Sequence, residues 1–244
     1  MQNDQPLTGK IILVTGAAQR LGRAFALACA KAGADAVIHY GNSKDQAEET
    51  KKEIASLGRK VWAVQADLSK ADSVANLISQ VNKIGQLYAL VNNAAIFEPL
   101  SVQETELSDW ERHLAINLTA PFLLSQSFSK QIGNGQGRII NILDWRALRP
   151  GADHFPYAIS KAALAAMTKS LAIAFAPNIA VNGLALGAIL PPSDQPTSNE
   201  ILKTVPAQRW SNLKEVEDAL IFLLTGPTYI TGEIIHMDGG RHLV

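Results

Sequence analysis

Residues 10–40 read KIILVTGAAQRLGRAFALACAKAGADAVIHY, and this stretch decides the fold. It holds an apolar run at 10–15, a turn with two glycines, an Ala- and Leu-rich segment at 20–32 and a second apolar run at 36–40. Short apolar runs rich in β-branched residues are typical of strands buried on both faces, whereas the segment between them has a helical composition. The order strand, helix, strand predicts two parallel strands joined by a helical crossover.

The same alternation continues along the rest of the chain. Further apolar runs occupy residues 60–66, 87–92, 138–143, 179–183 and 233–237. Segments with apolar residues at helical spacing occupy residues 44–57, 69–84, 109–132, 157–176 and 214–225. We therefore predict an α/β fold, a doubly wound parallel sheet of about seven strands with helices on both faces.

The composition is that of a globular protein with one large core. Its 244 residues, 47% hydrophobic and 18% charged, predict a single domain over 1–244. The 22 basic and 22 acidic side chains cancel, which argues against nucleic acid or an anionic membrane surface as a partner. The charge balance does not argue for or against a small-molecule partner.

Two observations favour a cytoplasmic protein without a membrane span. The start, MQNDQPLTG, has neither the basic residues nor the apolar stretch of a secretory signal. The uncharged stretch 170–193 is long enough to cross a bilayer, but Pro177, Gly187 and Pro191 interrupt it.

The one cysteine, Cys29, excludes an internal disulfide and a cysteine-based metal site, and we expect it to be a small buried residue.

The turn after the first strand, residues 15–22, is the expected cofactor-binding loop. Ligands of doubly wound sheets bind beyond the carboxyl ends of the strands. Gly16 can form the tight turn and Gly22 lets the next helix approach the sheet, while the helix N-terminus offers N–H groups and a positive dipole to a diphosphate. A glycine turn alone is common, but its place in a strand-helix-strand unit favours nucleotide binding.

Tyr157 and Lys161 have the i, i+4 spacing that places a phenol and an ammonium on one helical face. A neighbouring cation favours phenolate and lowers the pKa of the tyrosine toward the working pH, as a general acid or base requires. The alternative is a packed tyrosine beside a solvated lysine. The spacing alone does not separate the two.

Several short motifs occur together in the order typical of one family. They are residues 15–22, Asp67-Leu68, Asn92-Asn93-Ala94-Ala95, Asn117, the Tyr157 and Lys161 pair, and Asp238-Gly239-Gly240. In these motifs the sequence resembles the short-chain dehydrogenase/reductases over nearly its whole length. The resemblance implies an NAD(P)-binding Rossmann domain and a homotetramer built on the helices at 109–132 and 157–176.

The resemblance also implies roles for single residues. Tyr157 would be the catalytic acid, Lys161 would bind the nicotinamide ribose and lower the pKa of Tyr157, and Asn117 would hold a water in a proton relay. Asp67 would contact the adenine. The full set implied to bind the cofactor is Gly16, Arg20, Leu21, Tyr40, Asn42, Ser43, Asp67, Leu68, Asn93, Ala94, Ala95, Tyr157, Lys161, Gly187 and Ile189.

Asp144 stands where this family usually has a serine whose hydroxyl holds a substrate carbonyl. A carboxylate at that place disfavours negative charge developing on an oxygen, so simple ketone reduction suits it less well. An aspartate can instead hydrogen-bond an amino-pyrimidine edge, and when protonated it can pass a proton to a ring nitrogen. The alternative is that Asp144 only pairs with Arg146 or Arg149 in a surface turn.

The set of Asp144, Tyr157 and Lys161 resembles the pteridine reductases, and two further residues agree with this subgroup. Arg20 replaces the usual middle glycine of the first loop, and Phe97 matches an aromatic that stacks on the pterin. The alternative for Phe97 is a core position.

Other positions expected near the substrate agree with this subgroup only in part. The C-terminal GGRHL resembles the end of bacterial dihydromonapterin reductases. Ala95 stands where some pteridine reductases have serine, and His154 where some have a second tyrosine. Leu186-Gly187 replaces the usual Pro-Gly, and the irregular stretch that follows makes 187–210 a candidate substrate lid.

NADP is the expected cofactor because the end of the second strand lacks an acid. NAD enzymes place an acidic residue about 20 residues after the glycine motif to hold the ribose 2′-OH. Here residues 39–44 read HYGNSK. The subgroup uses the equivalents of Asn42 and Ser43, together with Arg20, for a 2′-phosphate.

These observations lead to three hypotheses. The first is NADPH-dependent reduction of a pterin of the dihydrobiopterin, dihydromonapterin or dihydrofolate type; the residues expected at the substrate are Arg20, Phe97, Asp144 and Tyr157. The second is a carbonyl reductase, such as a 3-oxoacyl thioester reductase, in which Asp144 only orients Tyr157. The third is a nucleotide-sensing protein that has lost turnover, although a pure sensor has no need of a proton relay.

Overall fold

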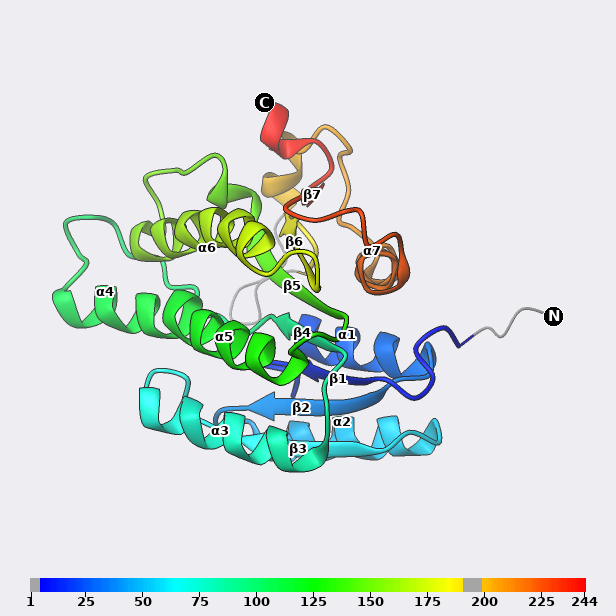
Figure 1. Cartoon of the computed structure of the whole chain (residues 1–244). Coiled ribbons are helices and arrows are strands. Elements are labelled where there is room, and N and C mark those ends of the chain that lie inside the picture. The colour runs from blue at the N-terminus through cyan, green and yellow to red at the C-terminus, as the bar shows by residue number, and fades with distance from the viewer. Residues whose placement is uncertain (1–4, 191–198) are drawn as a thin grey trace.

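Seven parallel strands, in the order β3-β2-β1-β4-β5-β6-β7, form one sheet in the computed structural model, which describes residues 5–190 and 199–244 (Figure 1). The strands are β1 Ile11–Val14, β2 Asp35–Tyr40, β3 Val61–Gln65, β4 Ala89–Asn92, β5 Gly137–Asp144, β6 Ile179–Leu186 and β7 Ile234–Met237. Each neighbouring pair is parallel. The predicted doubly wound parallel sheet is therefore confirmed.

Helices connect the strands and cover both faces of the sheet. They are α1 Arg20–Lys31, α2 Lys44–Ser56, α3 Ala71–Ile84, α4 Leu107–Leu114, α5 Ala120–Ile132, α6 Phe155–Ala174 and α7 Leu213–Thr225. Short 3-10 helices occur at Trp145–Ala147, Asn199–Thr204 and Arg241–Leu243.

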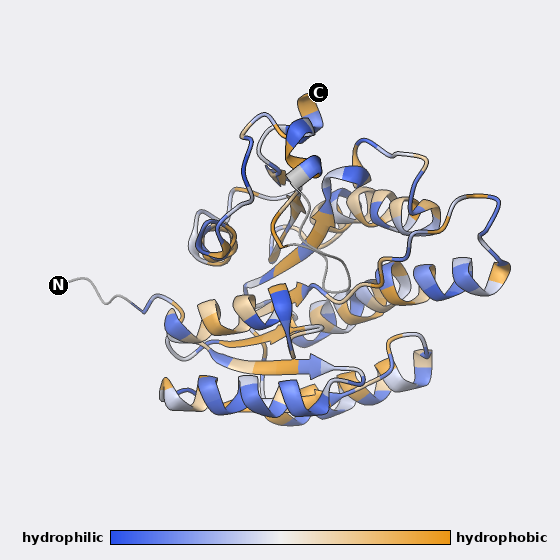
Figure 2. Cartoon of the chain, turned by 180° about the vertical axis from the view of Figure 1, so that it is seen from behind, coloured by the Kyte–Doolittle hydropathy of each residue, from blue (hydrophilic) through white to orange (hydrophobic). Residues whose placement is uncertain are grey.

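Two apolar cores flank the sheet. Helices α1, α2 and α7 pack on one face, and α3, α5 and α6 pack on the other (Figure 1). Successive strand residues supply opposite cores, since Ile12 packs on the first side and Leu13 on the second. Figure 2 shows the strands mainly in the hydrophobic colour, with hydrophilic residues on the outer surfaces of the helices. The near-continuous apolar runs of the sequence thus correspond to strands covered on both faces.

The strand order reverses at β1, and this reversal places the site. Strands β2 and β3 lie on one side of β1, whereas β4 to β7 continue on the other. The chain leaving β1 and the chain leaving β4 therefore diverge and open a crevice at the carboxyl ends of the two strands. Gly16, residues 18–22 and residues 93–97 border this crevice.

The helix predicted at 109–132 is divided by a π-helical turn. Helix α4 ends at Leu114, the π turn spans Ala115–Thr119, and α5 begins at Ala120. Such turns are rare and are frequent at functional sites, because the additional residue changes the direction in which side chains point. Asn117 lies in this turn. Strand β6 is longer than the predicted 179–183, since it extends to Leu186, whereas α6 is shifted toward the N-terminus, from the predicted 157–176 to Phe155–Ala174.

Cys29 is buried in α1, as expected, and burial raises the pKa of its thiol to about 12. It is therefore an unreactive packing residue. Within residues 5–190 and 199–244, no helix is both long enough and apolar enough to span a membrane.

Candidate active site

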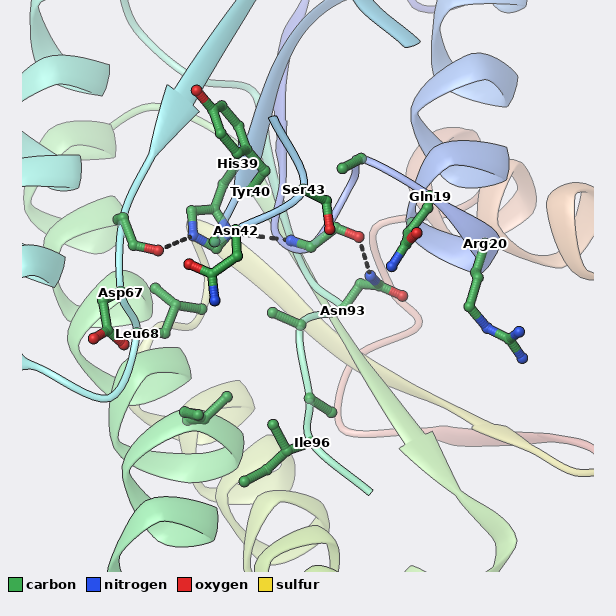
Figure 3. Close-up of a pocket in the computed structure, with 18 of the residues that line it drawn as sticks. Gln19, Arg20, His39, Tyr40, Asn42, Ser43, Asp67, Leu68, Asn93 and Ile96 are labelled. Carbon is green, nitrogen blue, oxygen red and sulfur yellow. Dashed lines mark hydrogen bonds between the residues drawn. The ribbon is translucent and has the colours of Figure 1, made fainter. Parts of the chain in front are cut away.

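The crevice between β1 and β4 is a cavity of about 850 Å³, within the usual size of small-molecule sites (Figure 3). Of the predicted site residues it brings together Gly16, Arg20, Leu21, Tyr40, Asn42, Ser43, Asp67, Leu68, Asn93, Ala94, Ala95 and Phe97. Side chains that sequence reasoning missed also line it, among them Gln19, His39, Gln65, Ser73, Ile96 and Ile116. The other predicted cofactor-binding residues, Tyr157, Lys161, Gly187 and Ile189, do not line it. Gly187 packs closely on Asp238, and Ile189 belongs to the core beside α1.

The glycines of the first turn permit close approach of three chain segments. Gly16 has a φ of +62°, and a Cβ on it would lie 3.0 Å from the Cα of Ala94. A Cβ on Gly22 would lie 2.0 Å from the carbonyl oxygen of Gly16. Arg20 has a φ of +54°, a left-handed conformation that is costly for a residue with a side chain. This strain explains why the family usually has glycine at that place.

The N-terminus of α1 points a set of backbone donors at the cavity. Gln19 makes no side-chain cap bond, and the first turn of the helix has no acidic residue. The N–H groups of a first turn have no partner within the helix, and the helix dipole adds partial positive charge. This arrangement fits the diphosphate of a dinucleotide.

Thr15 and Asn93 join the two walls of the crevice. The Thr15 hydroxyl accepts the backbone N–H of Asn93 at 2.9 Å and that of Ala94 at 3.0 Å. In return the Asn93 side-chain amide donates to the carbonyls of Thr15 at 2.8 Å and Gly16 at 3.2 Å. Asn93 therefore fixes the turn, in addition to lining the cavity.

Polar residues at the ends of β2 and β3 form the far side of the cavity. Tyr40 is the last residue of β2, and Asn42 and Ser43 lie in the turn that follows (Figure 3). The Asp67 carboxylate accepts from the hydroxyl of Ser69 at 2.6 Å and from its backbone N–H at 3.0 Å. These hydrogen bonds lower the pKa of Asp67, with Lys70 adding to the effect. Asp67 is therefore ionised and held in one orientation.

Tyr157, Lys161 and Asp144 meet where α6 crosses the end of β5. The Tyr157 hydroxyl donates to the Asp144 carboxylate at 3.1 Å. The Lys161 ammonium donates to the carbonyl of Ile142 at 2.7 Å and lies 5.8 Å from the centre of the Tyr157 ring. Both α6 side chains are buried, Tyr157 at 7% exposure and Lys161 at 2%.

The pKa of Tyr157 is raised well above its usual value, which corrects the expectation that Lys161 lowers it. Burial is the main cause, followed by the negative charge of Asp144 and the hydrogen bond to it. Burial also lowers the pKa of Lys161 to about 8. At neutral pH Tyr157 is thus an uncharged phenol that can donate a proton.

Asn117 fixes the position of Tyr157 through the backbone and through Ser160. Its amide oxygen accepts the N–H of Ile96 at 2.9 Å, and its two amide hydrogens go to the Ile96 carbonyl and the Ser160 hydroxyl. Ser160 in turn donates to the carbonyl of Tyr157 at 2.7 Å. The amide hydrogens of Asn117 are therefore used within the protein, and the side chain acts as a brace. Sequence reasoning missed Ser160, whose only signal is its place between Tyr157 and Lys161.

Asp144 bonds to Arg146 as well as to Tyr157. Its second oxygen accepts the backbone N–H of Arg146 at 2.8 Å, with the Arg146 guanidinium 3.8 Å away. Arg149, the other expected partner, instead donates to the carbonyl of Arg241 at 3.4 Å. The pairing with Arg146 and the contact with Tyr157 thus exist together.

An aromatic pair lies beside Tyr157. Phe97 stacks on His154 with ring centres 3.9 Å apart and presents its ring at 80° to Tyr157, at 4.7 Å. His154 is held by Asp153 at 3.0 Å, and Asp153 also accepts from Arg146 at 2.8 Å, which lowers the pKa of Asp153 to about 2. Phe97 is 51% exposed, so it is a wall of the site and not a core residue.

The candidate lid, 187–210, is described only in part, because residues 191–198 lie outside the described residues.

Comparisons with known proteins identify the family and agree with the fold. A model of the family described as short chain dehydrogenase matches residues 10–201. A 3-oxoacyl-[acyl-carrier-protein] reductase from Synechocystis is 35% identical, over 96% of this chain and 97% of that protein. The crystal structure of FolM alternative dihydrofolate reductase 1 from Brucella canis, complexed with NADP, is 33% identical with a TM-score of 0.92, covering 99% of this chain and 97% of that one. A short chain dehydrogenase from Burkholderia cenocepacia, in complex with NADP, is 33% identical with a TM-score of 0.91, covering 97% and 99%.

The lowered pKa of Lys161 predicts a pH dependence of stability. The unfolded chain holds the Lys161 proton up to its usual pKa of 10.5, whereas the folded chain releases it near pH 8. The unfolded state binds more protons between these values, so folding stability rises with pH in this window. Relative to Lys161→Met, the wild type should gain about 2 kcal/mol in free energy of unfolding from pH 7 to pH 10. Urea denaturation of both proteins measures the difference, and a constant difference over this range contradicts the assignment.

Proposed function

The chain belongs to the short-chain dehydrogenase family, and we propose that it is an NADPH-dependent reductase of dihydropterins. The family assignment makes it an NAD(P)-dependent oxidoreductase. The substrate and the preference for NADP are the parts that we infer from the residues of the site.

The cavity fits NADP. The α1 N-terminus and the Gly16 turn would hold the diphosphate, and Asp67 would contact the adenine. Arg20, Asn42 and Ser43 would surround a 2′-phosphate, because residues 39–44 offer no carboxylate to a ribose hydroxyl. Both solved structures described above are named as complexes with NADP. When bound, the reduced cofactor supplies the hydride.

The observation that carries the proposal is the hydrogen bond between Tyr157 and Asp144. A carbonyl substrate needs donors around its oxygen as negative charge develops there. Here a carboxylate occupies the place beside the phenol and would repel that charge. A dihydropterin suits the pair better, since its ring presents N–H donors to Asp144 and a C=N nitrogen to an acid.

Tyr157 and Asp144 can deliver one proton to the substrate. Reduction of a C=N bond adds a hydride to carbon and a proton to nitrogen, so one proton is needed per turnover. The raised pKa keeps that proton on Tyr157 until the nitrogen takes it, and the Asp144 carboxylate would then take a proton from solvent and pass it to the Tyr157 phenolate. Phe97, half exposed beside Tyr157, offers a flat face to a planar ring.

A second candidate function is reduction of 3-oxoacyl thioesters. The Synechocystis relative carries that name and aligns over nearly the whole chain. In this case Asp144 would only orient Tyr157, and a phenol with a raised pKa would donate to the carbonyl oxygen.

Substitution of Asp144 separates these candidates. Wild-type protein should oxidise NADPH with dihydrobiopterin or dihydrofolate and react poorly with an acetoacetyl thioester. Asp144→Ala should lower kcat for the pterin by about 100-fold or more, because the proton-delivering pair is lost. The affinity for NADPH should stay unchanged, since Asp144 lies outside the cofactor cavity.

The control for this experiment is Arg149→Ala, which alters the same loop away from Tyr157 and should keep full activity. Faster thioester reduction by the wild type, with pterins inert, would establish the second candidate. Binding of NADPH without turnover of any of these substrates would instead indicate a nucleotide-sensing protein.

Asn42→Asp tests the preference for NADP. The substitution keeps the side-chain shape but places a negative charge where the 2′-phosphate is expected. The dissociation constant of NADPH should rise roughly tenfold, while that of NADH stays equal or falls. Asn134→Asp introduces the same charge in an exposed loop and should change neither constant. Equal affinity of the wild type for NADH and NADPH contradicts the assignment.

We further propose a cytoplasmic homotetramer assembled on α4, α5 and α6, as the family resemblance implies. Large apolar side chains are exposed on these helices, including Leu107, Phe122 and Ile173. Their exposure is typical of surfaces that bury one another on assembly. Light scattering should give the mass of four 26.2 kDa chains, and the mass of one chain contradicts the proposal.

A further inference from the structure

We propose that His39 is a positioning residue that sets the affinity for the cofactor, by holding the backbone of the Gly16 turn through its ring nitrogen Nδ1. The inference concerns the cofactor alone and goes beyond the proposed function, because it holds for any substrate. It starts from a buried imidazole that the reaction does not use.

The ring of His39 bridges the carboxyl ends of three strands. His39 lies near the end of β2 and is only 2% exposed. The Gly16 N–H, after β1, donates to its Nδ1 at 3.1 Å. Its Nε2 lies 3.1 Å from the carbonyl oxygen of Ala66, after β3. Figure 3 shows both bonds converging on the ring at the wall of the cavity.

The two partners determine the protonation state of the ring. A backbone N–H can only donate, so Nδ1 must carry a lone pair. A carbonyl can only accept, so Nε2 must carry the hydrogen. The ring is therefore the neutral Nε2–H form, and burial, which lowers the pKa of His39, favours the same state.

His39 holds two consecutive amides of the turn. In addition to the ring bond with Gly16, its backbone carbonyl accepts the N–H of Ala17 at 2.8 Å. The segment they belong to is conformationally demanding, because Gly16 and Arg20 both have positive φ. Thr15 and Asn93 fix the turn from the β4 side, and His39 fixes it from the β2 side.

A turn held in this way presents its remaining donors to an anion without rearrangement. Preorganisation raises affinity because the cost of ordering is met before binding. If the acceptor at Nδ1 is removed, the Gly16 N–H loses its partner and the turn can rotate to find another. The expected consequence is weaker binding of NADPH, even where the overall fold persists.

Two amide variants separate the two ends of the ring. In His39→Asn the side-chain oxygen lies near the place of Nδ1 and can accept from Gly16. In His39→Gln the amide nitrogen reaches the place of Nε2 and can donate to Ala66, but the Gly16 N–H is left without its acceptor. Both variants lose the aromatic ring, so each is the matched control of the other.

Titration calorimetry of the full chain with NADPH gives the readout. His39→Gln should raise the dissociation constant roughly tenfold or more, and His39→Asn should stay within about threefold of the wild type. The melting temperatures of the two variants without cofactor should be similar. Equal losses of affinity in both variants, or an unchanged dissociation constant in His39→Gln, overturn the proposal.

A measurement on the wild type keeps the proposal testable if either variant fails to fold. Nitrogen-15 NMR of histidine-labelled protein at pH 7 should show the His39 imidazole in the neutral Nε2–H form, its signal being assigned by its loss in whichever variant folds or by its contact with Gly16. A charged ring or the Nδ1–H form at His39 overturns it.

Discussion

The hydrogen bonds between Thr15 and Asn93 are the constraint on which the rest of the site depends. They join the chain leaving β1 to the chain leaving β4, the two strands between which the sheet changes direction. Because these bonds hold the crevice at a fixed width, the N-terminus of α1 and the ends of β2 and β3 face one cavity. The close contacts of Gly16 and Gly22 follow from the same constraint, since any side chain there would force the walls apart.

The sequence was sufficient to predict the order of strands and helices, because buried parallel strands and their covering helices have different periods and compositions. It did not predict the π turn at Ala115–Thr119, whose residues, AINLT, continue the helical pattern on either side without a glycine or proline to mark a break. The turn is accompanied by bonds between Asn117 and Ile96, a contact between residues that are distant along the chain. A local sequence pattern does not reveal contacts between residues that are far apart in the chain.

The site residues that depend on local spacing were predicted, whereas those that depend on contacts between distant segments were not. The glycine turn and the Tyr157 and Lys161 pair could be found because their chemistry depends on short spacings. His39 and Ser160 were missed because their importance depends on what they contact. The predicted sign of the Tyr157 pKa shift was wrong for a similar reason, since the spacing of Tyr157 and Lys161 does not show that the phenol is buried and hydrogen-bonded to Asp144.

The zero net charge of the chain bears on how an anionic cofactor is bound. Without a large positive field, affinity for phosphate groups must come from donors close to the ligand. Backbone N–H groups carry only partial charges, so they compete with water only if they already point at the anion. The hydrogen bonds of Asn93 and His39 to the Gly16 turn meet this requirement from opposite sides. We therefore infer that the rigidity of this turn, together with Arg20 beside it, sets the affinity for the cofactor without a large positive field.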